Sequence, residues 1–329
     1  MQVPTFIQGC IAPTFTAFDQ SGALDPDGQR NLLDYMLQSG CISAFFLRSG
    51  MGQMYHFSCD DVKALARNAC GHLAGKAPCI IGCNGAWDRD FDRRPAPDQF
   101  ERECVELGHY AADQGADGIV YTVPEALAPR DGETYADRIL RFFEHMVREA
   151  RVPVFIYQPP GTHPDYELTP GLARSLAAMD GLCGVKVSYG DVPYVLGLIR
   201  AVKDEAFAFI TGNETIYFAT LYAGSRAVIG QGASVSPSVL DTVRQAFLAD
   251  NRERALQAQE ATNELVFRRI DSPWFLKRYA TEQGFPVGPW ARGNNGVSPY
   301  AVACDATDAA YEDYKRLFEE KLAQFPPPS

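Results

Sequence analysis

One lysine is distinguished by its surroundings. Of the seven lysines, Lys186 alone lies inside an apolar run, which extends from Leu182 to Ser188. Strand alternation places Val185 and Val187 on one face and Lys186 on the other. In a barrel that second face is the interior, where loss of water lowers the pKa of an ammonium group and makes the amine nucleophilic. Such an amine can form a Schiff base with a ketone; pairing with a buried carboxylate is the structural alternative.

A tyrosine ends the apolar run that precedes the lysine run. Tyr157 stands in Val154-Phe155-Ile156-Tyr157-Gln158-Pro159-Pro160. A phenol at this strand end can transfer protons to the carbinolamine that precedes a Schiff base, or to a substrate hydroxyl. The alternative is an interior tyrosine that donates to a backbone carbonyl.

A glycine-rich turn follows the second apolar run, in Leu47-Arg48-Ser49-Gly50-Met51-Gly52-Gln53. Glycines at alternating positions can direct backbone N–H groups toward an anion. A carboxylate would suit such a turn, so Gly50, Met51 and Gly52 are candidates for binding one. Glycine-rich turns that have no binding role are also common after strands.

The elements that would position these residues alternate regularly along the chain. Short apolar runs occur at residues 10–13, 44–47, 78–82, 118–121, 154–157, 184–188, 207–211 and 227–230. Amphipathic, helix-like stretches separate them, at residues 25–39, 59–73, 99–114, 134–148, 170–178, 192–202 and 215–222. This alternation predicts an α/β protein with a parallel sheet, and eight units predict a (β/α)₈ TIM barrel. Gly40, Gly75 and Gly115 follow helices and suit left-handed caps.

The pattern changes towards the C-terminus. Helical patterns at 237–248, 253–269 and 309–325 have no strands between them. We therefore predict a barrel over residues 1–236 that carries the active site, and a C-terminal helical extension over 237–329. A long charged loop at 87–97 follows the third strand, where it would be a surface loop, a specificity loop or a subunit contact.

Several motifs together resemble the dihydrodipicolinate synthase / N-acetylneuraminate lyase family of class I, Schiff-base aldolases. The resemblance extends from about residue 9 to residue 237. Its motifs are Ala12-Pro13-Thr14-Phe15-Thr16, Ser49-Gly50-Met51-Gly52-Gln53, Tyr157-Gln158-Pro159-Pro160 and Gly184-Val185-Lys186. The resemblance implies that Lys186 forms the Schiff base and that Tyr157 is its proton-transfer partner. It also implies that no cofactor is needed and that the chain forms a homotetramer or homodimer.

The sequence departs from the family at informative positions. Gly50 and Met51 replace two threonines of the carboxylate-binding turn, so the backbone amides remain but the hydroxyl that relays protons to the tyrosine is lost. The segment Val123-Pro124-Glu125-Ala126 lacks the second tyrosine of the synthases. Gly161-Thr162-His163 stands where the synthases place an arginine. These departures favour a sugar-acid substrate over that of the lysine-biosynthetic synthase.

Three polar residues follow the last three strands. Ser188, Glu214 and Gln231 are expected to bind hydroxyls of a polyhydroxylated chain, with ordinary loop polarity as the alternative. Glu214 matches in position an acidic residue that binds substrate hydroxyls in the neuraminate lyases. Met51 and Pro159 would make the pocket more apolar, which leaves an aromatic or alkyl 2-oxo acid open.

We therefore expect a Schiff-base lyase, either an aldolase or a dehydratase. Its substrate would be pyruvate or a 2-oxo acid such as a 2-keto-3-deoxy sugar acid. One alternative is a 4-hydroxy-tetrahydrodipicolinate synthase with an altered proton relay, and another is a non-catalytic barrel that binds a keto acid. The five histidines form neither HxH nor HExxH, so no metal site is predicted.

Composition limits the choice of partners. The chain has 329 residues and a net charge of −11, which argues against a nucleic-acid partner. It has no apolar run of membrane-spanning length, and its first residues lack the pattern of a signal peptide. The nine cysteines include no CxxC pair and are expected to be reduced thiols of a cytoplasmic protein.

Overall fold

The computed structural model describes residues 2–292 and 306–327. Eight parallel strands pair in sequence order and close into a barrel, with β1 beside both β2 and β8. The strands are β1 (Gly9–Pro13), β2 (Ile42–Leu47), β3 (Cys79–Gly82), β4 (Gly118–Thr122), β5 (Val154–Gln158), β6 (Leu182–Val187), β7 (Ala208–Thr211) and β8 (Ala227–Val228). The predicted TIM barrel is confirmed, and each strand overlaps its predicted range.

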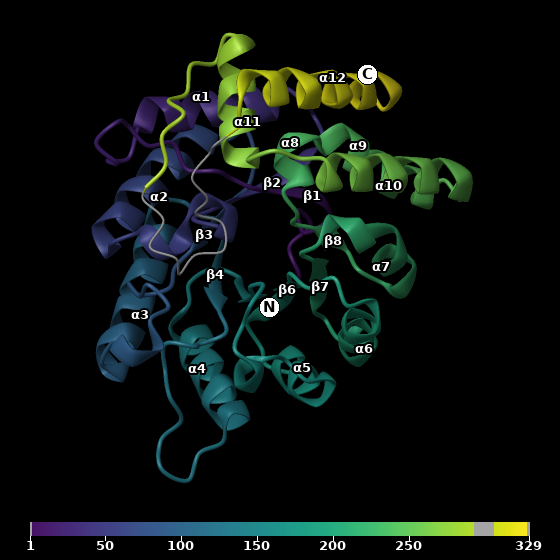
Figure 1. The fold of residues 1–329 in the computed structure, drawn as a ribbon. Helices are drawn as coiled ribbons and strands as arrows, with labels where there is room; N and C mark the ends of the chain where they lie inside the picture. Colours follow the sequence, from purple (N-terminus) through teal and green to yellow (C-terminus); the bar gives the residue numbers. More distant parts are fainter. Residues whose placement is uncertain (1, 293–305, 328–329) are drawn as a thin grey trace.

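A helix follows each of the first seven strands, and these helices surround the barrel (Figure 1). They are α1 (Pro26–Leu37), α2 (Cys59–Leu73), α3 (Pro97–Asp113), α4 (Tyr135–Glu149), α5 (Pro170–Ala177), α6 (Val192–Val202) and α7 (Tyr217–Ala223). The ends of α2 and α6 coincide with the sequence prediction.

Local chemistry explains where several helices begin and end. Ser58 before α2 and Thr134 before α4 each form a capping box with the aspartate at the third position of the helix. The side-chain oxygen of each capping residue accepts a hydrogen bond from the backbone amide of that aspartate, and the aspartate side chain accepts one from the backbone amide of the capping residue. Gly40, Gly75 and Gly115 follow α1, α2 and α3 with φ of 63°, 73° and 89°, which confirms the predicted left-handed conformations.

Apolar side chains form two layers separated by the strands. The inner cluster fills the barrel and includes Phe46, Phe155 and Ile210. The outer cluster lies between strands and helices and includes Val185 and Val187 of β6. The intervening Lys186 therefore belongs to the inner face, as strand alternation predicted.

The C-terminal helices pack together on one side of the barrel (Figure 1). They are α8 (Gly232–Val235), α9 (Pro237–Leu248), α10 (Arg252–Phe267), α11 (Ser272–Glu282) and α12 (Asp308–Gln324). The ends of α9 match the prediction, whereas α11 was not predicted. Because α9 contacts β1 and α7, it covers barrel strands as α1 to α7 do. The division of the chain at residue 236 stays a prediction.

Two further features concern the described residues alone. No helix among them combines the length and the apolar character that crossing a bilayer requires. Their eight cysteines are free thiols, and Cys104, for example, is fully buried. The ninth cysteine, Cys304, lies outside the described residues.

Candidate active site

Lys186 lies inside the barrel near the C-terminal end of β6. It pairs in register with Tyr157 of β5 and Ile210 of β7. The side chain is 5% exposed, and Nζ lies 4.0 Å from the centroid of the Tyr157 ring. Phe46 of β2 contributes a second ring, 5.6 Å from Nζ. The structure thus brings together the two residues for which the sequence predicted catalytic roles.

The surroundings of Lys186 disfavour its charged form. Burial lowers the pKa of Lys186 below its ordinary value, while Tyr157 and the carboxylate of Glu214 act in the opposite direction. The net effect increases the neutral fraction of the amine at a given pH. A neutral amine is the form that can attack a carbonyl carbon.

Glu214 is a buried acid in the same part of the barrel. It begins a short 3₁₀ helix, Glu214–Ile216, shortly after β7, and is 5% exposed. Its Oε1 accepts a hydrogen bond of 3.1 Å from the amide of Gly232. A side chain at Gly230 would collide with this carboxylate, so glycine is required there. Burial raises the pKa of Glu214 above its usual range.

The glycine-rich turn is fixed against the segment after β1. Ser49 Oγ donates to the carbonyl of Thr14 at 3.2 Å and accepts from the amide of Gly52 at 3.2 Å. A Cβ at Gly52 would lie 2.8 Å from that same carbonyl, which explains the glycine. Hydrogen bonds within the described residues do not use the amides of Gly50 and Met51. Because all strands are parallel, this turn and Lys186 lie at the same end of the barrel.

The other predicted hydroxyl-binding residues are less closely grouped. Ser188 directly follows β6, and its side chain packs against Gly212 at the end of β7. Gln231 faces the helical extension. With its amide nitrogen toward Ser272, 2.8 Å away, its oxygen accepts two bonds of 3.0 Å from Arg269. Of the three, Glu214 therefore has the clearest relation to Lys186.

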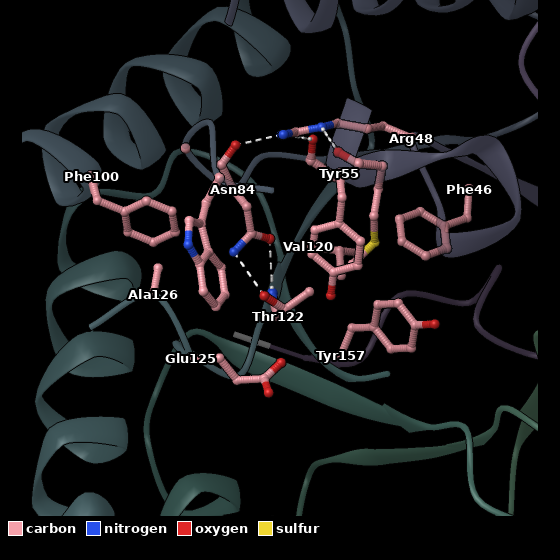
Figure 2. Close-up of a pocket in the computed structure, with 14 residues that line it drawn as sticks. Phe46, Arg48, Tyr55, Asn84, Phe100, Val120, Thr122, Glu125, Ala126 and Tyr157 are labelled. Carbon is pink, nitrogen blue, oxygen red and sulfur yellow. Dashed lines mark hydrogen bonds between the residues drawn. The ribbon is translucent and has the colours of Figure 1, made fainter. Parts of the chain in front are cut away.

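A small cavity lies beside Tyr157, on the side of β2, β3 and β4 (Figure 2). The sequence did not reveal it, because its wall combines strand residues with residues of three loops. The lining residues are Phe46, Arg48, Met54, Tyr55, Gly82, Asn84, Gly85, Trp87, Phe100, Val120, Thr122, Glu125, Ala126 and Tyr157. Phe46 and Tyr157 also lie beside the ammonium of Lys186, although Lys186 itself is not one of the lining residues.

The 87–97 loop lies at the edge of this cavity. Trp87 contributes to the wall, and Arg89 Nη2 lies 3.0 Å from Glu125 Oε1 in a buried ion pair. Arg89 also donates to the carbonyl of Gly161 at 2.6 Å, and Glu125 accepts from the amide of His163 at 2.8 Å. The loop is therefore tied to the ends of β4 and β5. In the sequence, Arg89 and Glu125 are only isolated charged residues that follow neighbouring strands. Nothing in the sequence indicated that they would form an ion pair.

Comparison with known proteins agrees with this geometry. The model of the dihydrodipicolinate synthetase family matches residues 6–293. The chain belongs to this family. Its sequence is 29% identical to that of YagE from Escherichia coli K12, over 70% of this chain and 71% of that protein. YagE is provisionally named a 2-dehydro-3-deoxy-D-gluconate aldolase.

Two further matches extend over nearly the whole chain. A 4-hydroxy-tetrahydrodipicolinate synthase from Herminiimonas arsenicoxydans is 25% identical over 93% of this chain and 94% of its own. The crystal structure of YagE in complex with pyruvate superposes with a TM-score of 0.77 at 24% identity, covering 95% of this chain and 98% of that one. The resemblance inferred from the motifs is thus confirmed, and the fold is that of the family.

Proposed function

We propose that this protein is a class I lyase that forms a Schiff base between Lys186 and a 2-oxo acid, with pyruvate as the product or the donor. The observation that carries the proposal is the buried amine of Lys186, held against Tyr157 at the mouth of a barrel. The relationship to YagE, whose name refers to a 2-dehydro-3-deoxy sugar acid and whose structure holds pyruvate, supports the same chemistry.

The reaction begins when the neutral amine of Lys186 adds to the C2 carbonyl of the 2-oxo acid. A proton reaches the carbinolamine hydroxyl, water leaves, and an iminium forms. In cleavage, the C4 hydroxyl loses its proton, the C3–C4 bond breaks, and its electron pair moves into the iminium to give an enamine and an aldehyde. Protonation at C3 and hydrolysis by water release pyruvate and restore the amine. The electron sink is therefore the lysine imine itself.

Two groups assist these steps. Tyr157 lies against the amine and exchanges protons with the carbinolamine and the C4 hydroxyl. The free amides of Gly50 and Met51 receive the carboxylate of the substrate. In dehydration, the intact iminium would instead lose a proton from C3, and the resulting enamine would expel the C4 hydroxide, which takes up a proton and leaves as water. The predictions of a homotetramer or homodimer and of a cytoplasmic location belong to this proposal.

The test is turnover. Purified protein is given 2-keto-3-deoxy sugar acids and 4-hydroxy-2-oxo acids, and released pyruvate is measured by coupling to lactate dehydrogenase and NADH. We expect Lys186→Ala to abolish release, and Tyr157→Phe to lower kcat by roughly 10²–10⁴-fold. Lys203→Ala, which removes an exposed lysine after α6, is the matched control and should behave like the wild type. Turnover that survives in Lys186→Ala would contradict the proposal.

A further inference from the structure

Two cysteines meet at the end of the barrel opposite to Lys186. Cys79 is the first residue of β3, and Cys70 lies in the last turn of α2, which packs against β3. Their Sγ atoms are 3.6 Å apart, which is within hydrogen-bond distance for sulfur. Among the eight described cysteines, these are the only two that share a thiol–thiol hydrogen bond. The pair is therefore a second cluster of reactive groups, distinct from the candidate active site.

The fold holds these two side chains toward each other. Both belong to the apolar layer between the strands and the helices, and only residues 74–78 separate α2 from β3. The two sulfur atoms would have to approach each other by about 1.5 Å to reach the length of a disulfide bond. Rotation of the two side chains can supply a movement of this size, so the helix and the strand need not separate.

An open hollow in the surface borders the pair. Its lining consists of Cys70, Cys79, residues 73–78, Gly115 and Asp117. Solvent reaches this hollow, because residues 74–76 are exposed. The two cysteines themselves are only 3% and 2% exposed. The sulfur atoms are therefore approached from one side, by a molecule as small as hydrogen peroxide rather than by a bulky reagent.

The two thiols differ in acidity. The hydrogen bond with Cys79 lowers the pKa of Cys70, because the S–H of Cys79 stabilises a thiolate at Cys70, while burial and the carboxylate of Asp117 act in the opposite direction. The same hydrogen bond, together with burial, raises the pKa of Cys79 well above its usual value. Cys70 can thus supply the thiolate that reacts with an oxidant, while Cys79 keeps its proton until the second step.

We propose that Cys70 and Cys79 are a site of reversible oxidation, at which hydrogen peroxide forms an intramolecular disulfide. The thiolate of Cys70 attacks one peroxide oxygen, the O–O bond breaks, and the departing hydroxide regains the proton that Cys70 released. The sulfur of Cys79 then attacks the sulfenic acid of Cys70, and the hydroxyl leaves with the Cys79 proton as water. The two thiols together lose two electrons, and the peroxide is reduced to two molecules of water. A dithiol reductant restores both thiols.

Peptide mass spectrometry of the oxidised native protein tests this site. The reduced protein is exposed to hydrogen peroxide, the remaining thiols are blocked with iodoacetamide in denaturant, and the chain is digested with trypsin. Cys70 lies in the tryptic peptide 68–76 and Cys79 in the peptide 77–89, so the disulfide joins two peptides. We expect this linked pair to be the first disulfide product and to disappear on treatment with dithiothreitol.

Cys83 provides the matched control, because it stands in the same tryptic peptide as Cys79. Cys83 is fully buried, and its Sγ lies 3.5 Å from the carbonyl oxygen of Ile81. Cys83→Ala should keep the linked pair of peptides, whereas Cys79→Ala should lose it. The oxidised wild type should also unfold at a higher denaturant concentration than the reduced wild type, because the link restricts the unfolded chain. Oxidation should cause no such shift in Cys79→Ala.

Two results would overturn the proposal. One is a first disulfide that joins any other two cysteines, including a link through Cys83. The other is recovery of Cys70 and Cys79 as free thiols at a peroxide dose that fully oxidises glutathione in the same buffer. Neither result bears on the proposed lyase activity, because the pair lies at the opposite end of the barrel from Lys186.

Discussion

At the scale of single residues, the proposed chemistry depends on how burial changes the reactivity of one amine. Lys186 has apolar neighbours along β6 and aromatic rings around Nζ, so its ammonium form loses hydration without gaining a close ion pair of comparable strength. Glu214 and Tyr157 moderate this effect. The sequence could predict this residue because a single lysine in an apolar strand is conspicuous.

This environment predicts how imine formation depends on pH. Only the neutral amine adds to a ketone, so the rate of adduct formation should rise with pH and level off above the lowered pKa of Lys186. The midpoint should lie below 10.5, the ordinary value for lysine. Because the carboxylate of Glu214 stabilises the ammonium, Glu214→Gln should move the midpoint to lower pH. Rates of borohydride trapping at saturating pyruvate give the pH profiles of the wild type and of Glu214→Gln. A wild-type midpoint at 10.5 or above would contradict the lowered pKa of Lys186.

At the scale of elements, β6 must fit closely against its neighbours to present Lys186. The pairing of β5 with β6 shifts register between Val154 and Phe155, where Phe155 pairs with Gly184. A Cβ at Gly184 would lie 2.6 Å from the backbone carbonyl of Ala208 in β7. The glycine two residues before the lysine is therefore a packing requirement of the barrel, and not only part of a family motif.

Gly184→Ala should consequently disturb both stability and reactivity. We expect the free energy of unfolding to fall by about 1–3 kcal/mol, because a strand must move to admit the methyl group. Imine formation should slow at the same time, since Lys186 would move with β6. Gly71→Ala, at an exposed position of α2 with no heavy atom near the added Cβ, is the control and should be neutral or slightly stabilising. Equal denaturation midpoints for the two variants would argue against this packing role.

The elements themselves were largely predictable, because apolar runs, helix caps and terminal glycines are local signals. The omission of α11 has a physical reason. Ser272–Glu282 includes Lys277, which weakens its apolar pattern. In the structure this lysine is 2% exposed, and its Nζ donates to the carbonyl of Trp290 at 2.7 Å. Tertiary contacts thus bury a residue that the sequence suggests is exposed.

At the scale of the whole molecule, the C-terminal part reaches back to the candidate site. Arg292 donates to the carbonyl of Gly22 at 2.8 Å and binds both carboxylate oxygens of Asp61, at 2.7 and 3.0 Å. Its backbone exchanges two hydrogen bonds of 3.1 Å with the side chain of Gln53, the last residue of the glycine-rich turn. The segment after α11 therefore fixes the turn that is proposed to hold the substrate carboxylate.

Contacts between residues that are far apart along the chain explain which features the sequence could not reveal. Lys186, Tyr157 and the turn were found because each ends a recognisable strand. The cavity was not, because Tyr55, Trp87 and Glu125 come from loops after three strands and meet only in the folded barrel.

The Schiff-base role of Lys186 is tested most directly by borohydride trapping with pyruvate, followed by intact and peptide mass spectrometry. We expect a single reduced pyruvyl group on the peptide that contains Lys186. The adduct should be absent from Lys186→Ala and present in Lys203→Ala. An adduct on another lysine would contradict the assignment of Lys186, and failure to trap pyruvate or any member of a 2-oxo-acid panel would contradict Schiff-base catalysis in this barrel.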